Sequence, residues 1–422
     1  MKRLLILTAT LVAFILIPAT VLFAQQNSYP DRIVLNPLED GVRGVAITWK
    51  SPVFADEGMV QWKKAQAHPV TDISSFHEKA AKTKLDTADF EGTLTPYRSF
   101  RVKLDGLNPA TEYMYRVGHE DTGWSEWIQF QLPASNPDST LTFIYMGDAQ
   151  NDVRSQWSRS IRKAYSAAPE ASFILYAGDL VNRGYNDREW NDWYQAGDFI
   201  HRMIPMIPTP GNHEYGHDDK GIYLSPLWRS HFTLPHNGPQ DQEELAGTSY
   251  YVDYPSVRII SLDADQIHEV EEMRAAQARW LDRVLEENTK PWTIVTLHYP
   301  FYSTEPDRDN PKLRKRFKSI LDRHQVDLVL QGHDHAYGRG MIDREGATDN
   351  NGTMYVVSVS GPKMYDLASE PWMQKSADNI QLYQVINIEQ DQLKYKSYKI
   401  TGELFDSFTL QKLSKDHIIL ED

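Results

Sequence analysis

The sequence predicts two domains of different fold class: an N-terminal all-β sandwich and a C-terminal α/β domain with four α-β-β-α layers. Residues 28–134 contain short strand-like runs and little helical periodicity, as in small sandwiches. From Leu141 onward strand-like runs alternate with helical patterns, which favours layered α/β structure. A segment rich in proline and polar residues, 133–139, separates the two patterns. We therefore expect domains at residues 28–134 and 140–415.

Composition narrows the class of protein. The 422 residues are 41% hydrophobic and 24% charged, which is ordinary for a globular chain of about two domains. The 44 Lys and Arg against 58 Asp and Glu give a formal net charge of −14. An acidic chain repels phosphate backbones, so we expect no stable nucleic-acid partner, although local cations can still hold a small phosphorylated substrate. The oligomeric state stays open.

The first 24 residues are set apart from the fold. Two basic residues precede an apolar stretch from Leu4 to Phe23, which ends at Ala24. This pattern is typical of a secretory signal peptide at residues 1–24. An uncleaved membrane anchor is the alternative, because the run is close to spanning length. The chain has no cysteine, which favours a bacterial cell envelope or medium. We predict a secreted or periplasmic protein with no membrane contact after signal cleavage.

The predicted sandwich consists of segments that alternate or run apolar over strand lengths. These are residues 32–35, 44–49, 59–62, 100–104, 113–117 and 127–131. A spacer or a partner-binding surface is one role for this domain. A passive packing domain is the alternative that we favour, because fold alone does not give function.

The α/β domain has four predicted helices, at 156–167, 187–203, 271–287 and 311–324. Its apolar strand-like runs are 141–146, 173–177, 206–210, 292–297, 327–331, 354–359, 381–386 and 393–400. The last three strands follow the final helix, so we expect two facing sheets with helices on the outside. Open α/β sheets place their ligands beyond the carboxyl ends of the strands.

The first five of these runs each finish in a side chain that can bind metal. In order they deliver Asp148, Asp179, Asn212, His298, and His333 with His335. Taken singly, each has an ordinary explanation, since Gly-Asp is a common turn and a lone histidine is usually structural. Taken together they supply the mixed oxygen and imidazole donors of a two-metal site. Two ions roughly 3.5 to 4 Å apart, bridged by one carboxylate, can acidify a water and neutralise phosphoryl oxygens.

These blocks resemble the calcineurin-like metallophosphoesterase superfamily. The resemblance is carried by Gly147-Asp148, Gly178-Asp179, Gly211-Asn212-His213-Glu214, Val295-x-x-His298 and Gly332-His333-Asp334-His335. With a sandwich in front, the order is similar to purple acid phosphatases and their bacterial relatives. The piece from Leu104 to Tyr113 resembles the turn into the late strands of fibronectin type III domains.

The resemblance implies a role for each position. Asp179 would bridge the two ions. Asp148 and His335 would complete the first site, and Asn212, His298 and His333 the second. His213 would lie beside the metals as leaving-group proton donor or phosphate contact, a role suited to an imidazole. The resemblance thus implies two divalent metal ions, of iron, manganese or zinc.

Two positions depart from the family pattern. Purple acid phosphatases have an iron-binding tyrosine three residues after the bridging aspartate, where this chain has Asn182. The wider superfamily often has histidine two residues after the first aspartate, where this chain has Gln150. Without the phenolate we expect divalent metals, with Gln150 or Asn182 as a neutral oxygen donor to the first ion. The alternative for both is hydrogen bonding that orients the ligands.

The sequence therefore predicts an exported phosphoesterase that hydrolyses phosphomonoesters through a metal-bridging hydroxide. His213 and Asp179 are the expected catalytic residues. Arg183 could join His213 in binding the phosphate through its fork of donors, or it could form a surface ion pair. One alternative is a phosphodiesterase or nucleotide pyrophosphatase with the same centre. Another is a non-catalytic cell-surface binding protein with a relic phosphatase domain.

Overall fold

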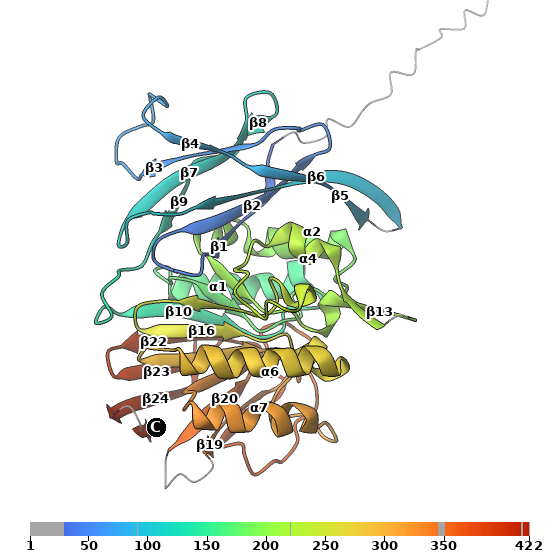
Figure 1. The fold of residues 1–422 in the computed structure, drawn as a ribbon, viewed down its shortest axis with the longest axis vertical. Helices are drawn as coiled ribbons and strands as arrows, with labels where there is room; N and C mark the ends of the chain where they lie inside the picture. The colour runs from blue at the N-terminus through green and yellow to red at the C-terminus, as the bar shows by residue number, and fades with distance from the viewer. Residues whose placement is uncertain (1–28, 91, 220, 345–350, 415–416, 422) are drawn as a thin grey trace, which may run out of the picture.

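The N-terminal part of the chain is a β-sandwich (Figure 1). The computed structural model describes residues 29–90, 92–219, 221–344, 351–414 and 417–421, so the predicted signal peptide at 1–24 lies outside the described residues. One sheet has the order β1-β2-β6-β5 and the other β4-β3-β7-β8, with β9 also paired to β7. The strands are β1 (Asp31–Pro37), β2 (Val45–Pro52), β3 (Met59–Lys64), β4 (His77–Ala80), β5 (Lys82–Phe90), β6 (Thr93–Leu104), β7 (Glu112–His119), β8 (Gly123–Trp124) and β9 (Ile128–Gln131).

The sandwich core follows from strand alternation. Inward side chains such as Trp49 and Phe100 are buried and stack with their ring centroids 5.3 Å apart. Every described pairing in these sheets is antiparallel. Strands β4 and β5 were not predicted, because their side chains are mostly exposed and polar and leave no apolar run in the sequence.

The first sheet of the α/β domain carries three parallel strands at one edge. Its order is β12-β11-β10-β22-β23-β24-β25, and β10, β11 and β12 run parallel while the rest pair antiparallel. The bounds are β10 (Leu141–Met146), β11 (Ile174–Tyr176), β12 (Met206–Pro208), β22 (Leu382–Glu389), β23 (Gln392–Lys399), β24 (Leu404–Ser414) and β25 (His417–Glu421).

The second sheet has a parallel centre. Its order is β15-β16-β17-β18-β20-β19-β21, with β16, β17, β18 and β20 parallel. The bounds are β15 (Tyr250–Asp253), β16 (Val257–Ser261), β17 (Trp292–Leu297), β18 (Leu328–Gln331), β19 (Tyr337–Asp343), β20 (Gly352–Val357) and β21 (Lys375–Ala377). A small hairpin, β13 (Tyr215–Asp218) with β14 (Gly221–Leu224), projects from the same side as the β5–β6 ribbon (Figure 1).

Helices cover the outer faces of both sheets, as predicted. They are α1 (Ser158–Ala167), α2 (Asp187–Gly197), α3 (Phe199–Met203), α4 (Pro226–His231), α5 (Ala264–Glu269), α6 (Glu271–Glu286) and α7 (Pro311–Arg323), with a π-helical turn η1 (Val153–Trp157) and 3-10 turns η2 (Asn212–Glu214) and η3 (Glu243–Leu245). No helix in the described ranges has the length and apolar character needed to cross a membrane.

The prediction of a single helix over residues 187–203 is wrong, because this segment forms two helices, α2 and α3. The helix stops at Gly197, and Asp198 takes a left-handed φ of 40° before α3 begins. A Cβ at Gly197 would lie 2.1 Å from the His201 ring, so the missing side chain gives this buried histidine its space. The apolar pattern in the sequence continues through residues 187–203, so it gave no sign of the break at Asp198.

Two apolar cores hold the α/β layers together. One lies between the facing sheets and extends to α1 and α2, and it contains Ile294 of β17 and Leu330 of β18. The other lies between the second sheet and helices α5, α6 and α7, and it contains Val295 and Leu281. Because the central strands are buried on both faces, they form continuous apolar runs, and their carboxyl ends meet at one edge of the molecule.

Candidate metal centre

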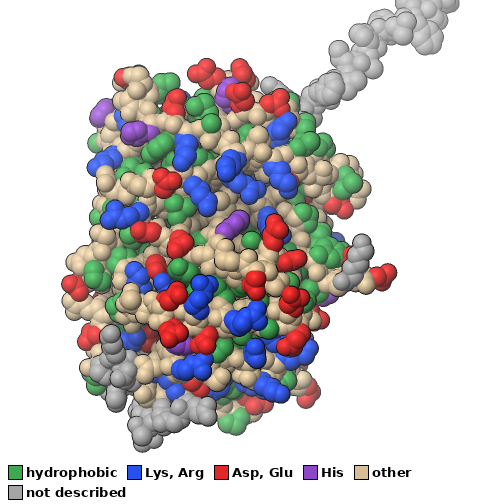
Figure 2. All heavy atoms as spheres, viewed as in Figure 1, with side chains coloured by type: hydrophobic (Ala, Val, Ile, Leu, Met, Phe, Trp, Pro, Cys, Tyr) green, Lys and Arg blue, Asp and Glu red, His purple; other side chains and the backbone are tan. Residues whose placement is uncertain are grey.

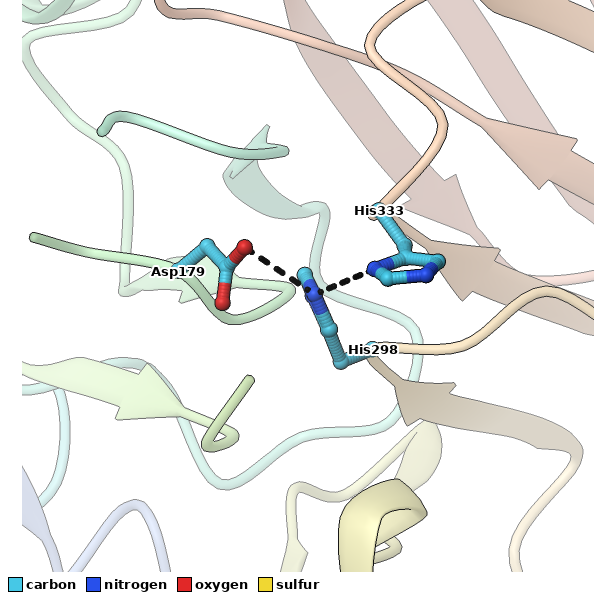
Figure 3. Close-up of side chains that lie close together, drawn as sticks. All are labelled: Asp179, His298 and His333. Carbon is cyan, nitrogen blue, oxygen red and sulfur yellow. Dashed lines mark hydrogen bonds and ion pairs between the residues drawn. The ribbon is translucent and has the colours of Figure 1, made fainter. Parts of the chain in front are cut away.

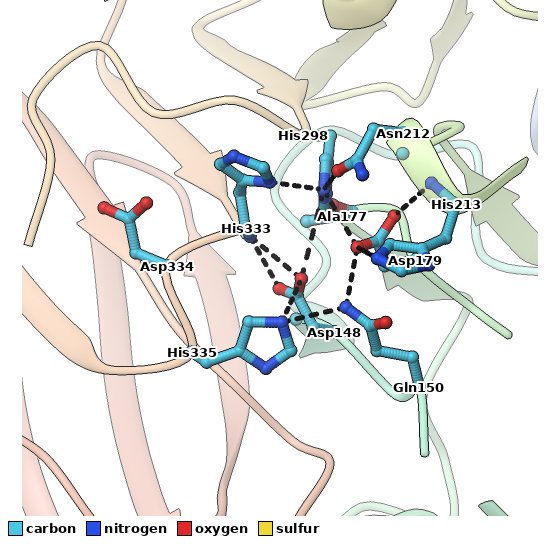
Figure 4. A network of polar contacts seen from close by, with 12 residues as sticks. Asp148, Gln150, Ala177, Asp179, Asn212, His213, His298, His333, Asp334 and His335 are labelled. Atoms are coloured by element: carbon cyan, nitrogen blue, oxygen red, sulfur yellow. Dashed lines mark hydrogen bonds and ion pairs between the residues drawn. The ribbon is translucent and has the colours of Figure 1, made fainter. Parts of the chain in front are cut away.

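The six positions predicted to be the main donors lie at the carboxyl ends of parallel strands. Asp148 follows β10, Asp179 follows β11, Asn212 follows β12, His298 follows β17, and His333 and His335 follow β18. The first three come from one sheet and the histidines from the other. Figure 4 shows that these side chains, together with Gln150 and His213, point toward a common centre.

The donor atoms form two groups that share one carboxylate. The atoms of Asp179, His298 and His333 all lie within 4.8 Å of one another (Figure 3), and the same holds for Asp148, Asp179 and His335. Oδ1 of Asn212 lies 3.1 Å from Nε2 of His298 and so belongs to the first of these groups. A carboxylate common to two sets of oxygen and imidazole donors is the arrangement that a two-metal site needs.

The two oxygens of Asp179 have different surroundings. Oδ1 accepts a hydrogen bond from the backbone N–H of His213 at 3.0 Å. Oδ2 lies 3.2 Å from Nε2 of His298 and 2.8 Å from Nε2 of Gln150. The oxygen that faces both donor groups is therefore Oδ2, while Oδ1 fixes the orientation of the carboxylate.

The backbone is strained at these residues. Asp179, His333 and His335 have φ values of 51°, 77° and 47°, in the left-handed region that L-residues seldom occupy. Gly178 has a φ of 91°, and a Cβ there would lie 2.6 Å from Nδ1 of His298. The Gly-Asp pair thus provides both the turn and the close approach of the histidine.

Backbone carbonyls fix the histidine tautomers. Nδ1 of His298 donates to the carbonyl of Ala177 at 2.8 Å, and Nδ1 of His335 donates to that of Lys363 at 2.9 Å. Each ring therefore turns Nε2 toward the carboxylates, and Nε2 is the atom that would bind a metal ion. His333 instead presents Nδ1, which lies 3.1 Å from Nε2 of His298.

The electrostatics of the buried groups favour a cation. Burial, and secondarily the Asp179 charge, raises the pKa of Asp148 to about 7. Burial alone would lower the pKa of His298, but the charges of Asp179 and Asp148 outweigh it and raise that pKa to about 10. His298 thus serves as the positive partner of two buried carboxylates. A divalent cation would take over that role and release the proton.

Of the two predicted neutral donors, Gln150 reaches the centre. Its Nε2 lies 2.8 Å from Oδ2 of Asp179 and 2.8 Å from Nε2 of His335, while its Oε1 is buried without a hydrogen-bond partner. The two ends of an amide have the same shape, so turning it would direct Oε1 at the same point. Asn182 instead accepts a hydrogen bond at its backbone carbonyl from Nδ1 of His213, at 2.5 Å.

His213 and Arg183 lie at the rim. Nε2 of His213 is 3.8 Å from Oδ2 of Asp179, and a quarter of its side chain (25%) is exposed. Arg183 bonds through Nε to Oε1 of Glu189 at 2.5 Å, and 66% of its side chain is exposed. Arg183 and Asn182 line a cavity of about 710 Å³ with Asn151. The arginine is thus held on the cavity wall by the ion pair that was its predicted alternative.

Two buried acids in the ligand motifs were not assigned roles from the sequence. Glu214 and Asp334 are both fully buried, and neither belongs to a donor group. The sequence did indicate that these acids lie near the centre, since each stands inside a motif that supplies donors. Their hydrogen bonds could not be inferred, because these depend on how neighbouring loops approach one another.

Sequence comparison identifies both domains. The profile of the calcineurin-like phosphoesterases matches residues 141–337, and that of the purple acid phosphatase N-terminal domain matches residues 30–132. An Arabidopsis thaliana protein named Fe(3+)-Zn(2+) purple acid phosphatase 12 is 27% identical over 318 residues, covering 70% of this chain and 62% of the relative. A phosphoenolpyruvate phosphatase of Allium cepa is 30% identical over 254 residues, covering 56% and 49%. The matches thus span less than two thirds of either relative.

Solved structures share the fold. The purple acid phosphatase PPD1 from yellow lupin (Lupinus luteus) seeds superposes with a TM-score of 0.75 at 18% identity, over 92% of this chain and 75% of that one. The structure of PhoD gives 0.66 at 16% identity, over 93% and 92%. The domain order, the matched family profiles and the motifs that supply the donors all indicate the same pair of domains. This chain therefore contains a calcineurin-like phosphoesterase domain, preceded by a domain that matches the N-terminal domain of purple acid phosphatases.

Proposed function

We propose that this chain is a phosphomonoesterase that depends on two divalent metal ions, of iron, manganese or zinc. The observation that carries the proposal is the position of Asp179, which two groups of oxygen and imidazole donors share. In this proposal Asp148, Asp179, His335 and Gln150 hold one ion, and Asp179, Asn212, His298 and His333 hold the other. The names of the relatives from Arabidopsis and onion support both the metal dependence and the monoester substrate.

The residues of the chain divide the work of hydrolysis. Two bound ions would acidify a water molecule and offset the charge on the phosphoryl oxygens. Asp179 keeps Oδ2 between the two donor groups because the His213 N–H holds Oδ1. His213 in turn has Nδ1 bonded to the Asn182 carbonyl, so Nε2 is the atom that faces the centre. When the ring also carries a proton on Nε2, it can pass that proton to the departing alkoxide oxygen and remain as the neutral imidazole protonated on Nδ1.

The cavity beside the centre suits a small polar leaving group. It is lined by Asn151, Asp152, Val153, Arg154, Ser155, Asn182, Arg183, Glu189 and Asp192. Only one of these side chains is apolar and none is aromatic, so the cavity offers hydrogen bonds and no stacking surface for a base. We propose that the alcohol part of the ester lies there and that Arg183, on the cavity wall, binds its phosphate.

We also propose that the protein is exported and acts on small phosphorylated compounds outside the cytoplasm. Residues 1–24 have the pattern of a signal peptide and the chain lacks cysteine. On the face drawn in Figure 2, basic and acidic side chains are interspersed, which gives no continuous basic surface for nucleic acid. In this proposal the domains are residues 28–134, fibronectin type III-like, and 140–415.

A substrate panel tests the proposal. Wild type and Asn212→Ala, loaded with manganese or zinc, are assayed with p-nitrophenyl phosphate, bis(p-nitrophenyl) phosphate and nucleotides. We expect the monoester to be preferred and kcat/KM of the variant to fall at least about 100-fold, because a ligand of one ion is lost. The exposed Asn136→Ala in the interdomain segment is the control and should keep wild-type activity. Equal turnover of the diester would instead favour a phosphodiesterase.

A further inference from the structure

Glu214 and Asp334 are acidic residues that stand among the donors without joining them. Asp334 lies between the donors His333 and His335, and Glu214 lies two residues after the donor Asn212. Both have 0% of their surface exposed. A buried carboxylate is costly unless its oxygens accept hydrogen bonds, so the partners of each define what the residue does.

The Glu214 carboxylate accepts hydrogen bonds from two different loops. Oε2 accepts from the backbone N–H of Asp179 at 3.0 Å and from that of Gly211 at 2.8 Å. Oε1 accepts from the backbone N–H of Leu180 at 2.9 Å. Glu214 therefore ties the loop that carries the shared carboxylate to the loop that carries Asn212.

The Asp334 carboxylate does the same in the second sheet. Its Oδ2 accepts from the backbone N–H of Thr304 at 2.6 Å and from Oγ of Ser303 at 2.7 Å. Its Oδ1 accepts from Nη1 of Arg308 at 2.8 Å. These partners all lie on the loop after His298. Asp334 thus ties the loop that carries His333 and His335 to the loop that begins at His298.

The carboxylates act where the backbone is strained. Asp179, whose N–H bonds to Glu214, has a φ of 51°, and both neighbours of Asp334 have positive φ values. Conformations of this kind persist only where surrounding contacts enforce them. Both oxygens of each carboxyl group accept hydrogen bonds from the loops described above, so each residue supplies contacts of that kind.

We propose that Glu214 and Asp334 are positioning residues, each of which fixes one pair of donor loops so that the metal-binding atoms converge. The proposal rests on the proposed function, because it assigns these residues to the same two-metal centre. It assigns them no contact with substrate. An isosteric amide at Glu214 would turn an N–H₂ group toward backbone N–H donors. At Asp334 it would turn that group toward either Arg308 or the Thr304 N–H. We expect both changes to loosen the loops and weaken metal binding.

The test measures metal affinity. Wild type, Glu214→Gln and Asp334→Asn are freed of metal and titrated with Mn²⁺ or Zn²⁺ by calorimetry, and bound metal is counted after dialysis. We expect each amide variant to bind the metals about 10- to 100-fold more weakly, the range found when partners that orient metal ligands are lost. Circular dichroism of the metal-free proteins checks that each variant is folded.

Asp327→Asn is the matched control. Asp327 is also fully buried and also accepts a backbone N–H, from Thr293 at 2.7 Å, but it lies at the amino end of β18, away from the centre. This variant should lose stability and keep wild-type metal affinity. If it loses metal affinity as well, the effect is general destabilisation and the positioning role is wrong.

The outcomes separate this inference from the proposed function. Wild type that binds fewer than two ions would overturn the proposed function itself. Two ions in wild type and unchanged affinity in both amide variants would overturn only the positioning role. If Glu214→Gln is recovered unfolded, Glu214→Asp replaces it, because this variant keeps the charge but draws the carboxylate back from the N–H groups by one methylene.

Discussion

Asp179 is held from several directions at once. Its backbone N–H bonds to Glu214, its Oδ1 accepts from His213, and its Oδ2 faces the donor groups. The backbone of Gly211 approaches the carboxylate from the remaining side, and its own φ of −105° is ordinary. The glycine is therefore needed here for space and not for conformational freedom.

We expect Gly211→Ala to displace Asp179. A Cβ at Gly211 would lie 2.2 Å from Oδ1 and 2.5 Å from the backbone nitrogen of Asp179, distances that no relaxed structure keeps. The carboxylate must move, so metal content and kcat/KM should fall at least about 10-fold, as for other changes that misplace ligands. Metal analysis and a p-nitrophenyl phosphate assay measure both.

Gly106→Ala provides the control for the glycine prediction. Gly106 has a φ of 67° and no atom within 4 Å of an added Cβ. The substitution therefore strains the sandwich domain, by roughly 1 kcal/mol, without touching the centre. Its metal content should equal that of wild type. Normal metal content in Gly211→Ala would contradict the prediction, because it would show that the loop carrying Asp179 can move to accommodate the added Cβ without losing metal.

At the scale of elements, the sandwich is anchored to the segment that carries the shared carboxylate. Arg32 of β1 donates from Nη1 and Nη2 to the two oxygens of Asp187, at 2.5 and 2.9 Å, and Lys50 of β2 adds a contact at 3.0 Å. Asp187 is the first residue of α2, eight positions after Asp179. A loop of the α/β domain is thus fixed at its far end by the neighbouring domain.

The Asp187 cluster predicts a pH dependence. Burial would raise the pKa of Asp187, but Arg32 and then Lys50 outweigh it and lower the pKa to about 2. A depressed carboxylate pKa contributes stability above pH 4 that is lost as the pH falls toward 2, here about 2 kcal/mol. Asp187→Asn leaves Arg32 buried without its partner and should cost roughly 3 kcal/mol at pH 7.

Thermal unfolding of the metal-free proteins between pH 2 and 7 measures this effect. The wild-type midpoint should exceed that of Asp187→Asn near neutrality, and the difference should narrow below pH 4. Asp31→Asn is the control, because Asp31 is mostly exposed and 4.0 Å from Nε of Arg32. The unfolding midpoint of Asp31→Asn should differ little from that of wild type at any pH. A constant difference between wild type and Asp187→Asn at all pH values would contradict the ionic account.

Elements differed in how far the sequence could predict them. Strands β10, β17 and β18 are covered on both faces, so they form apolar runs that end at a recognisable donor. The edge strand β4, with every side chain exposed, leaves no such run. The hydrogen bond from Asp179 to Glu214 joins residues 35 apart in sequence. The side chains that converge could be predicted from their motifs, but a hydrogen bond between two loops depends on how those loops fold.

At the scale of the whole molecule, the donor groups connect the two sheets of the α/β domain. Each group combines a carboxylate from the first sheet with at least one histidine from the second. A cation bound by either group would therefore link the sheets at their carboxyl ends. Folding and metal binding are coupled whenever a site exists only in the folded chain.

We expect chelation to lower the thermal unfolding midpoint. At a metal concentration 100 times the dissociation constant, one site contributes about 2.7 kcal/mol, which corresponds to a shift of about 5 °C or more for a domain of this size. Adding manganese or zinc should restore the original midpoint, which should then rise with the logarithm of the metal concentration.

The variants show whether this effect comes from the proposed site. Asn212→Ala should show a smaller shift of the midpoint on chelation, since it retains only one complete donor group, whereas Asn136→Ala should behave as wild type. A midpoint indifferent to both chelator and metal would mean that the donors, although they converge, do not bind cations tightly enough to join the sheets.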